Sequence, residues 1–252
     1  MSKNAEPQTI DARLKKFNNN LFECLIRIYD DYKIKNRELS FEEMIQMKSA
    51  LSDVNNIITL LITRKFVEKL KEDHLINADV DKIDSNPNAN GYDLLLLESN
   101  KIIIAEVKGN KPCKKISDGY IYGSDQQKGI IKDLTGLIKI KKKASKKLQI
   151  DFHNAIRFMV LLDSKYTKKA FEGLTSNLEP TDSDSDNDLK KAKQDFAEAL
   201  RNFNKSDDKS DDKIFEEYTS NPNNSLDSKK IYVYYIQPDD NLISELLDNK
   251  NN

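Results

Sequence analysis

The chain has 252 residues, of which 38% are hydrophobic and 33% are charged, and its formal net charge is -1. This length is enough for one medium-sized domain with a sizeable core. With a mean hydropathy of -0.70 and no signal-peptide pattern or long apolar run, we expect a cytoplasmic protein that does not contact a membrane. Two cysteines are too few for a disulfide framework or a zinc site, and two histidines do not favour histidine catalysis.

The N-terminal region is predicted to be helical. Apolar residues recur at steps of three and four from Ile10 to Tyr32, which predicts a long amphipathic helix. Its apolar stripe is typical of a core or of a partner surface and not of a cofactor site. We therefore expect residues 1–75 to form a helical region that packs on the rest of the protein.

A second helix is expected after a polar break. Ser40 and Glu43 have the spacing of a capping box, and an apolar helical period continues from Met44 to Leu61. This helix is predicted to run to about Asp73, and the sequence leaves a break near Ser52 open.

A β-hairpin follows, and it carries the most informative residues of the chain. Two apolar runs flank a polar Ser99-Asn100 turn, which is the composition of two buried neighbouring strands. If these two residues form the loop, Glu98 faces Lys101, and moving five positions outward on each strand sets Asp93 against Glu106. This register sets Asp93 opposite Glu106, with their Cβ atoms about 5 Å apart.

Two carboxylates and an amine are predicted to meet at the end of this hairpin. Glu106 and Lys108 share a face because side chains two apart on a strand point the same way. Two close carboxylates need compensation, and a divalent cation with oxygen ligands supplies it. The alternative is that Asp93, Glu106 and Lys108 are ordinary strand-end charges in solvent. Burial among apolar residues favours the site, because unpaired charges there are costly.

These residues resemble the motif of the PD-(D/E)XK nuclease superfamily, which has the restriction-endonuclease-like fold. The resemblance covers about residues 57–162 and is specific in the hairpin, where Tyr92 stands in place of the motif's proline. It implies that Asp93, Glu106 and the Val107 carbonyl bind Mg²⁺, and that Lys108 assists the attacking water.

The same resemblance implies a further acid on the preceding helix. Glu68 is our candidate for this catalytic role, and Glu72 is less favoured. The alternative is that Glu68 is a solvated residue paired with Arg64, four positions earlier.

A helix is predicted to begin at Ser124, after a lysine-containing loop over residues 109–123. The resemblance implies that a Gln or Lys of this helix approaches the scissile phosphate, and Gln126 and Lys128 are the candidates. Gln127 is instead explained by a capping box with Ser124.

Lysines cluster on both sides of this helix. Lys111 and Lys114 lie in the loop before it, and a run that includes Lys142 follows it. Such cations hold phosphate backbones through counterion release and position a duplex without reading its sequence. A solvated lysine-rich surface is the alternative.

The rest of the chain adds strands and a long polar stretch. Residues 157–162 and 231–236 are predicted strands, and residues 175–229 are predicted to be a flexible acidic insertion that contains one helix over 190–203. The alternating acids of 181–188 lack the glycine and glutamate of a calcium loop, so an acidic linker is favoured.

We therefore expect an α/β protein with a restriction-endonuclease-like central mixed β-sheet flanked by helices, the N-terminal helical region and a nuclease core over 76–252. The expected activity is Mg²⁺-dependent hydrolysis of DNA phosphodiester bonds by a type II-like restriction or other defence endonuclease. Double-stranded DNA is the expected partner, and a two-fold homodimer would match its symmetry. An inactive nucleic-acid-binding or interaction module of the same fold, and an RNA nuclease, are the alternatives.

Overall fold

A five-stranded sheet with strand order β1-β2-β5-β7-β6 lies at the centre of the protein. The computed structural model describes residues 9–35, 40–80, 83, 91–98, 101–117, 119–139, 151–181, 186–204, 214–219 and 226–237. The strands of the sheet are β1 (Leu94–Glu98), β2 (Lys101–Lys108), β5 (Ile156–Leu162), β6 (Phe215–Glu217) and β7 (Ile231–Ile236). β1 runs antiparallel to β2, and the other neighbours are parallel, so the sheet is mixed as predicted.

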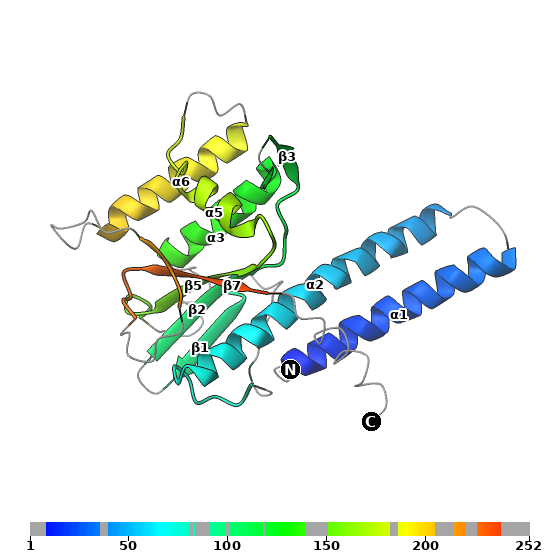
Figure 1. Ribbon diagram of the computed structural model, residues 1–252. Coiled ribbons are helices and arrows are strands. Elements are labelled where there is room, and N and C mark those ends of the chain that lie inside the picture. The colour runs from blue at the N-terminus through cyan, green and yellow to red at the C-terminus, as the bar shows by residue number, and fades with distance from the viewer. Residues whose placement is uncertain are drawn as a thin grey trace, which may run out of the picture.

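Helices cover both faces of this sheet (Figure 1). The elements outside the sheet are α1 (Ile10–Lys35), α2 (Phe41–Glu72), the short hairpin of β3 (Lys114–Ile116) and β4 (Gly119–Ile121), α3 (Ser124–Lys139), α5 (Thr167–Thr175) and α6 (Asn187–Asn204). α1 and α2 lie on one side, and α3, α5 and α6 lie on the other. No helix in the described part of the chain is long and apolar enough to cross a membrane.

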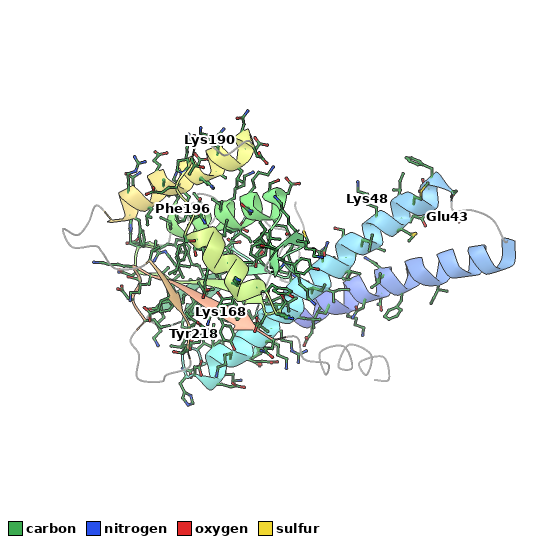
Figure 2. The ribbon with its side chains drawn as sticks, turned by 45° about the horizontal axis from the view of Figure 1, so that its top comes forward. Glu43, Lys48, Lys168, Lys190, Phe196 and Tyr218 are labelled. Carbon is green, nitrogen blue, oxygen red and sulfur yellow. The ribbon has the colours of Figure 1, made fainter. Side chains whose placement is uncertain are left out.

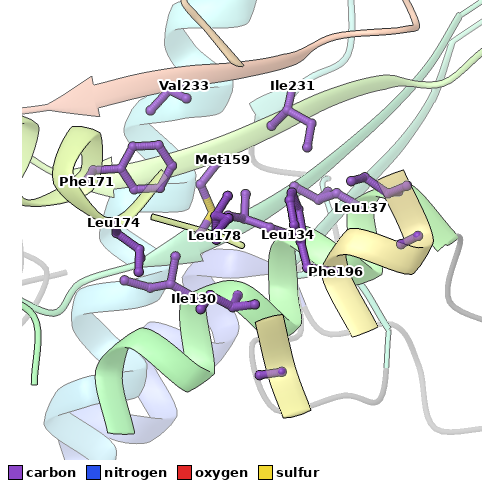
Figure 3. Close-up of a cluster of buried hydrophobic side chains, with 14 of the residues drawn as sticks. Ile130, Leu134, Leu137, Met159, Phe171, Leu174, Leu178, Phe196, Ile231 and Val233 are labelled. Carbon is purple, nitrogen blue, oxygen red and sulfur yellow. The ribbon is translucent and has the colours of Figure 1, made fainter. Parts of the chain in front are cut away.

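Two apolar clusters, one on each face, hold the layers together. In β2, Ile104 contributes to the cluster under α3, whereas Ile103 and Ala105 contribute to the cluster under α2. Figure 3 shows the α3 side, where Leu134, Met159 and Phe196 meet from three elements. Burial on both faces explains why the central strands are nearly continuous apolar runs.

Most of the predicted elements are confirmed. The capping box is present, because the Ser40 amide donates to Glu43 at 2.6 Å and the Glu43 amide donates to Ser40 Oγ at 3.3 Å. α2 continues without a break through Ser52 and ends at Glu72. The two predicted late strands correspond to β5 and β7.

The expected insertion over 175–229 requires a correction, since part of it belongs to the core. The buried α6 side chains Leu189, Ala192 and Phe196 join the cluster under α3, and β6 pairs in parallel with β7. The sequence interpretation also missed α5 and the β3-β4 hairpin. Within the acidic run, residues 182–185 lie outside the described residues.

A buried arginine joins the loops at the far end of the sheet. Arg157 is fully buried, and all five of its N–H donors bond to backbone carbonyls. Burial lowers its pKa, with a smaller opposing effect from Tyr92. The acceptors are the carbonyls of Leu137 (2.9 Å), Ala155 (2.6 Å), Phe152 (3.2 Å), His153 (3.5 Å) and Ser228.

Replacing this arginine is expected to destabilise the fold strongly. Arg157→Met keeps the volume but leaves several buried carbonyls without a donor, so the free energy of unfolding should fall by about 3 kcal/mol or more. Urea denaturation measures this difference. Arg201→Met, at an exposed position of α6, is the matched control and should change stability little; equal effects of the two substitutions would contradict the structural role of Arg157.

Candidate active site

The predicted hairpin register is confirmed by the strand pairing. Glu98 pairs with Lys101 and Leu94 pairs with Ala105, so the next positions in the same register are Asp93 and Glu106. The loop residues Ser99 and Asn100 themselves lie outside the described part of the chain. Asp93 precedes β1 directly and remains close to β2, because the Val107 amide donates to Asp93 Oδ2 at 2.8 Å.

Side chains along β2 point alternately to the two faces of the sheet, so the site residues and their chain neighbours lie on opposite faces. Val107 is buried in the cluster under α2, whereas Glu106 and Lys108 face α3. Glu106 is 2% exposed. Lys108 forms an ion pair with Asp133 of α3, and both side chains of this pair are partly buried.

The charges of the cluster affect one another. Burial alone would lower the pKa of Lys108, but Asp133, followed by Asp93 and Glu106, outweighs burial, and the pKa is raised above its ordinary value. The ammonium group therefore stays charged at neutral pH. All three carboxylates act on it, so the structure brings Asp93, Glu106 and Lys108 together as the sequence pattern predicts.

The donor atoms of this cluster suit a small hard cation. Asp93 and Glu106 supply carboxylate oxygens, and the Val107 carbonyl is expected at the same strand edge as the Val107 amide, which donates to Asp93. Among the described residues, no group of three or more His, Cys, Asp or Glu side chains is placed to hold a metal. The fit therefore depends on two carboxylates and one backbone oxygen, a set compatible with Mg²⁺, which usually keeps several waters.

Glu68 is placed elsewhere. It pairs with Arg64 at 3.2 Å, and Arg64 also reaches Asp11 of α1 at 3.3 Å. α2 passes the end of β2 at Ile58, where a Cβ on Gly109 would lie 2.6 Å from the Ile58 side chain. Glu68 lies ten residues, about 15 Å, further along the helix. The structure shows the ion pair with Arg64 and does not bring Glu68 to the other acids.

Gln126 holds the start of α3 to the preceding loop. Its side-chain oxygen accepts from the Gly123 amide at 3.1 Å, and its side-chain nitrogen donates to the Lys111 carbonyl at 3.0 Å. Gln127 donates to the Tyr122 carbonyl at 2.7 Å. This bond fixes the same turn, but it is not the capping-box bond that the spacing with Ser124 predicts.

The predicted cationic residues differ in their surroundings. Lys128 pairs with Asp125 at 2.7 Å and with Asp186 at 3.3 Å, so its ammonium group is engaged in ion pairs within the protein. Lys111 and Lys114 are exposed on the segment that directly follows β2. Lys142 lies outside the described residues.

Asp133 is the site residue that the sequence interpretation missed. It lies between the buried residues Ile130, Leu134 and Leu137 on the inner face of α3. An acid three residues after Ile130 and four before Leu137 shares their helix face, so its spacing was the available signal. Only the fold shows that this face meets Lys108.

Comparison of the chain with protein-family models, with curated proteins and with solved structures finds no match. The case for a function therefore depends on the geometry of the cluster itself. That geometry places Glu106, the Val107 carbonyl and the charged Lys108 at the end of β2, beside Asp93 at the start of β1.

Removing the lysine is expected to destabilise the protein even without metal or substrate. Lys108→Met removes the ion-pair partner of Asp133 and the positive charge beside Glu106, so stability at neutral pH should fall by about 1–3 kcal/mol. Urea denaturation with chelator present measures the loss.

Two further variants test the cause of that loss. Lys111→Met, at an exposed position, should have little effect. Adding Asp133→Asn to Lys108→Met should restore part of the stability, because the two side chains interact directly. Fully additive effects of Lys108→Met and Asp133→Asn would contradict the ion pair.

Proposed function

We propose that this protein is a Mg²⁺-dependent endodeoxyribonuclease with a restriction-endonuclease-like fold, acting in restriction or another form of DNA defence. The observation that carries the proposal is the position of Asp93 directly before β1, where the strand register continues opposite Glu106 of β2, with Lys108 on the same face as Glu106. The mixed sheet with helices on both faces is compatible with this fold.

Asp93, Glu106 and the Val107 carbonyl would hold the metal. When bound, Mg²⁺ supplies a Lewis acid that polarises the scissile phosphate and lowers the pKa of the attacking water. Asp93 is anchored by the Val107 amide. The site thus presents carboxylates from two strands whose relative position is fixed by the sheet.

Lys108 acts as a cation and not as a base. Its raised pKa keeps the amine protonated, so it can orient the attacking water or stabilise negative charge on the phosphate, but it cannot accept a proton. Asp133 holds the ammonium group from the α3 side. Lys108 is thereby positioned beside Asp93 and Glu106 before any substrate binds.

The DNA backbone would approach along the segment after β2. Ligands of open α/β sheets bind outside the carboxyl ends of the parallel strands, and β2 and β5 end at this edge. Lys111 and Lys114 are exposed there, close in sequence to Lys108. They would contact phosphates and orient the duplex over the carboxylates.

A second candidate is a nucleic-acid-binding or interaction module that does not cut. The burial of Glu106 and the ion pair of Lys108 with Asp133 favour it, since the cluster already compensates much of its own charge. Binding of DNA without cleavage in either Mg²⁺ or Mn²⁺ would support this candidate over the nuclease.

Cleavage assays with single variants test the nuclease. Asp93→Ala and Lys108→Ala should each reduce Mg²⁺-dependent cutting of duplex DNA by about a thousandfold or more, because metal binding and charge stabilisation are lost. DNA binding, measured by fluorescence anisotropy with Ca²⁺ in place of Mg²⁺, should remain.

Glu68→Gln is the matched control for these variants. Glu68 pairs with Arg64 and lies away from the cluster, so cutting should be retained. Unchanged cutting by Asp93→Ala or Lys108→Ala would refute the assigned site, and matched RNA and DNA duplexes would show which nucleic acid is the substrate.

Salt dependence tests the backbone contacts. The double variant Lys111→Ala/Lys114→Ala should reduce the slope of log K against log salt by about 2, since each lost phosphate contact contributes about 0.9. The control Lys71→Ala/Lys101→Ala removes the same charge from exposed positions at the end of α2 and at the opposite end of β2. An equal change in both variants would contradict a specific binding edge.

A further inference from the structure

The outer part of the α1-α2 hairpin extends well beyond the sheet. Figure 1 shows both helices projecting from the body of the protein, and Figure 2 shows Glu43 and Lys48 near the far end of α2. α2 has 32 residues, about 48 Å at the rise of an α-helix. Only its second half packs against the strands.

The apolar stripe of α2 continues past the edge of this core. In the inner half, Ile58 and Leu61 pack against the cluster under α2. In the outer half, four large apolar side chains face solvent. Their exposed fractions are 75% for Phe41, 49% for Met44, 47% for Ile45 and 62% for Leu51.

These four side chains form one continuous patch, which we call the outer stripe. At about 100° per residue they fall within an arc of about 120° on the helix, and Phe41 and Leu51 are about 15 Å apart along its axis. Lys48 lies within the same arc. Ala50 and the capping residue Glu43 are buried, so they belong to a different face of α2.

We propose that the outer stripe is the contact surface for a second copy of this chain, joined by a two-fold axis that sets the two α2 helices antiparallel. With residue 46 at the axis, Phe41 packs against the partner subunit's Leu51, and Met44 packs against the aliphatic stem of the partner subunit's Lys48. A parallel pair would set Lys48 against the partner's Lys48, which like-charge repulsion disfavours.

The size of the stripe suits a modest but closed dimer. The exposed fractions correspond to roughly 400 Å² of apolar surface per chain, the size of the largest apolar patch on a typical monomer, and such patches are often functional. Both copies with their flanking polar side chains approach the lower end of specific interfaces, about 1,200 Å² in total. Because the same patch serves both copies, the contact closes as a dimer and does not propagate. We expect a dissociation constant in the micromolar range.

Sedimentation velocity over a series of concentrations tests the surface. The full-length protein should sediment as a dimer at high concentration, without metal or DNA. Phe41→Glu/Leu51→Glu should weaken association on the order of a hundredfold, because it puts charges where the dimer would bury apolar side chains. Both positions are exposed in the single chain, so the circular dichroism spectrum and melting temperature should change little.

Leu97→Glu is the matched control. Leu97 is 52% exposed on β1, outside the outer stripe, so the same chemical change there should leave the dimer intact. A wild-type protein that stays monomeric would overturn the proposal, and so would a dimer that Phe41→Glu/Leu51→Glu leaves unchanged. Because the assay contains no nucleic acid, its result is independent of nuclease activity.

Disulfide crosslinking tests the antiparallel register. In a background with Cys24→Ser and Cys113→Ser, chains carrying Phe41→Cys should crosslink to chains carrying Leu51→Cys when the two are mixed under mild oxidation. Either chain alone should not crosslink, because its own positions would lie about 15 Å apart across the axis, beyond disulfide reach. Efficient crosslinking of Leu51→Cys chains with each other would refute this register.

Discussion

The antiparallel pairing of β1 with β2 is the constraint on which the candidate site depends. Side chains alternate along a strand, so a slip of one residue would turn Glu106 into the cluster under α2. The apolar residues oppose such a slip: Leu94 and Leu96 fill one cluster, and Ile104 fills the other. Each large side chain contributes about 1.5–3 kcal/mol by burial. The packing of the core therefore fixes which carboxylates face each other.

Burying carboxylates in an apolar sheet costs free energy, and the groups around Glu106 and Asp93 offset part of that cost. Glu106 is nearly inaccessible, and Lys108 beside it supplies positive charge that Asp133 keeps in place from α3. Asp93 receives the Val107 amide. In the described part of the chain, Asp93, Glu106 and Asp133 all act on Lys108. The proposed cation would add a second positive charge beside these acids, which is the compensation that close carboxylates need.

How well a feature can be predicted from the sequence depends on whether neighbouring residues or contacts between distant segments determine it. The hairpin register is local, because a two-residue loop and apolar strands determine it, and the Ser40 capping box spans three residues. Asp133 meets Lys108 through a contact between distant segments. β3 and β4 are local, but they are short and largely exposed, so they lack the apolar alternation that predicts a strand. The position of Glu68 relative to the site cannot be predicted either, because it depends on where α2 crosses the sheet. The sequence places α6 in an insertion because polar segments flank it, although one face of this helix is buried in the cluster under α3.

α2 links the two proposals mechanically, because one unbroken helix carries both the outer stripe and the contact with the end of β2. Ile58 meets Gly109 just after Lys108, and it lies about 18 Å along the helix from residue 46. In a two-fold dimer centred there, the two strand ends are separated by about 36 Å along the helix axis, close to one turn of B-DNA. A continuous helix resists bending, so it would hold two sites at this spacing.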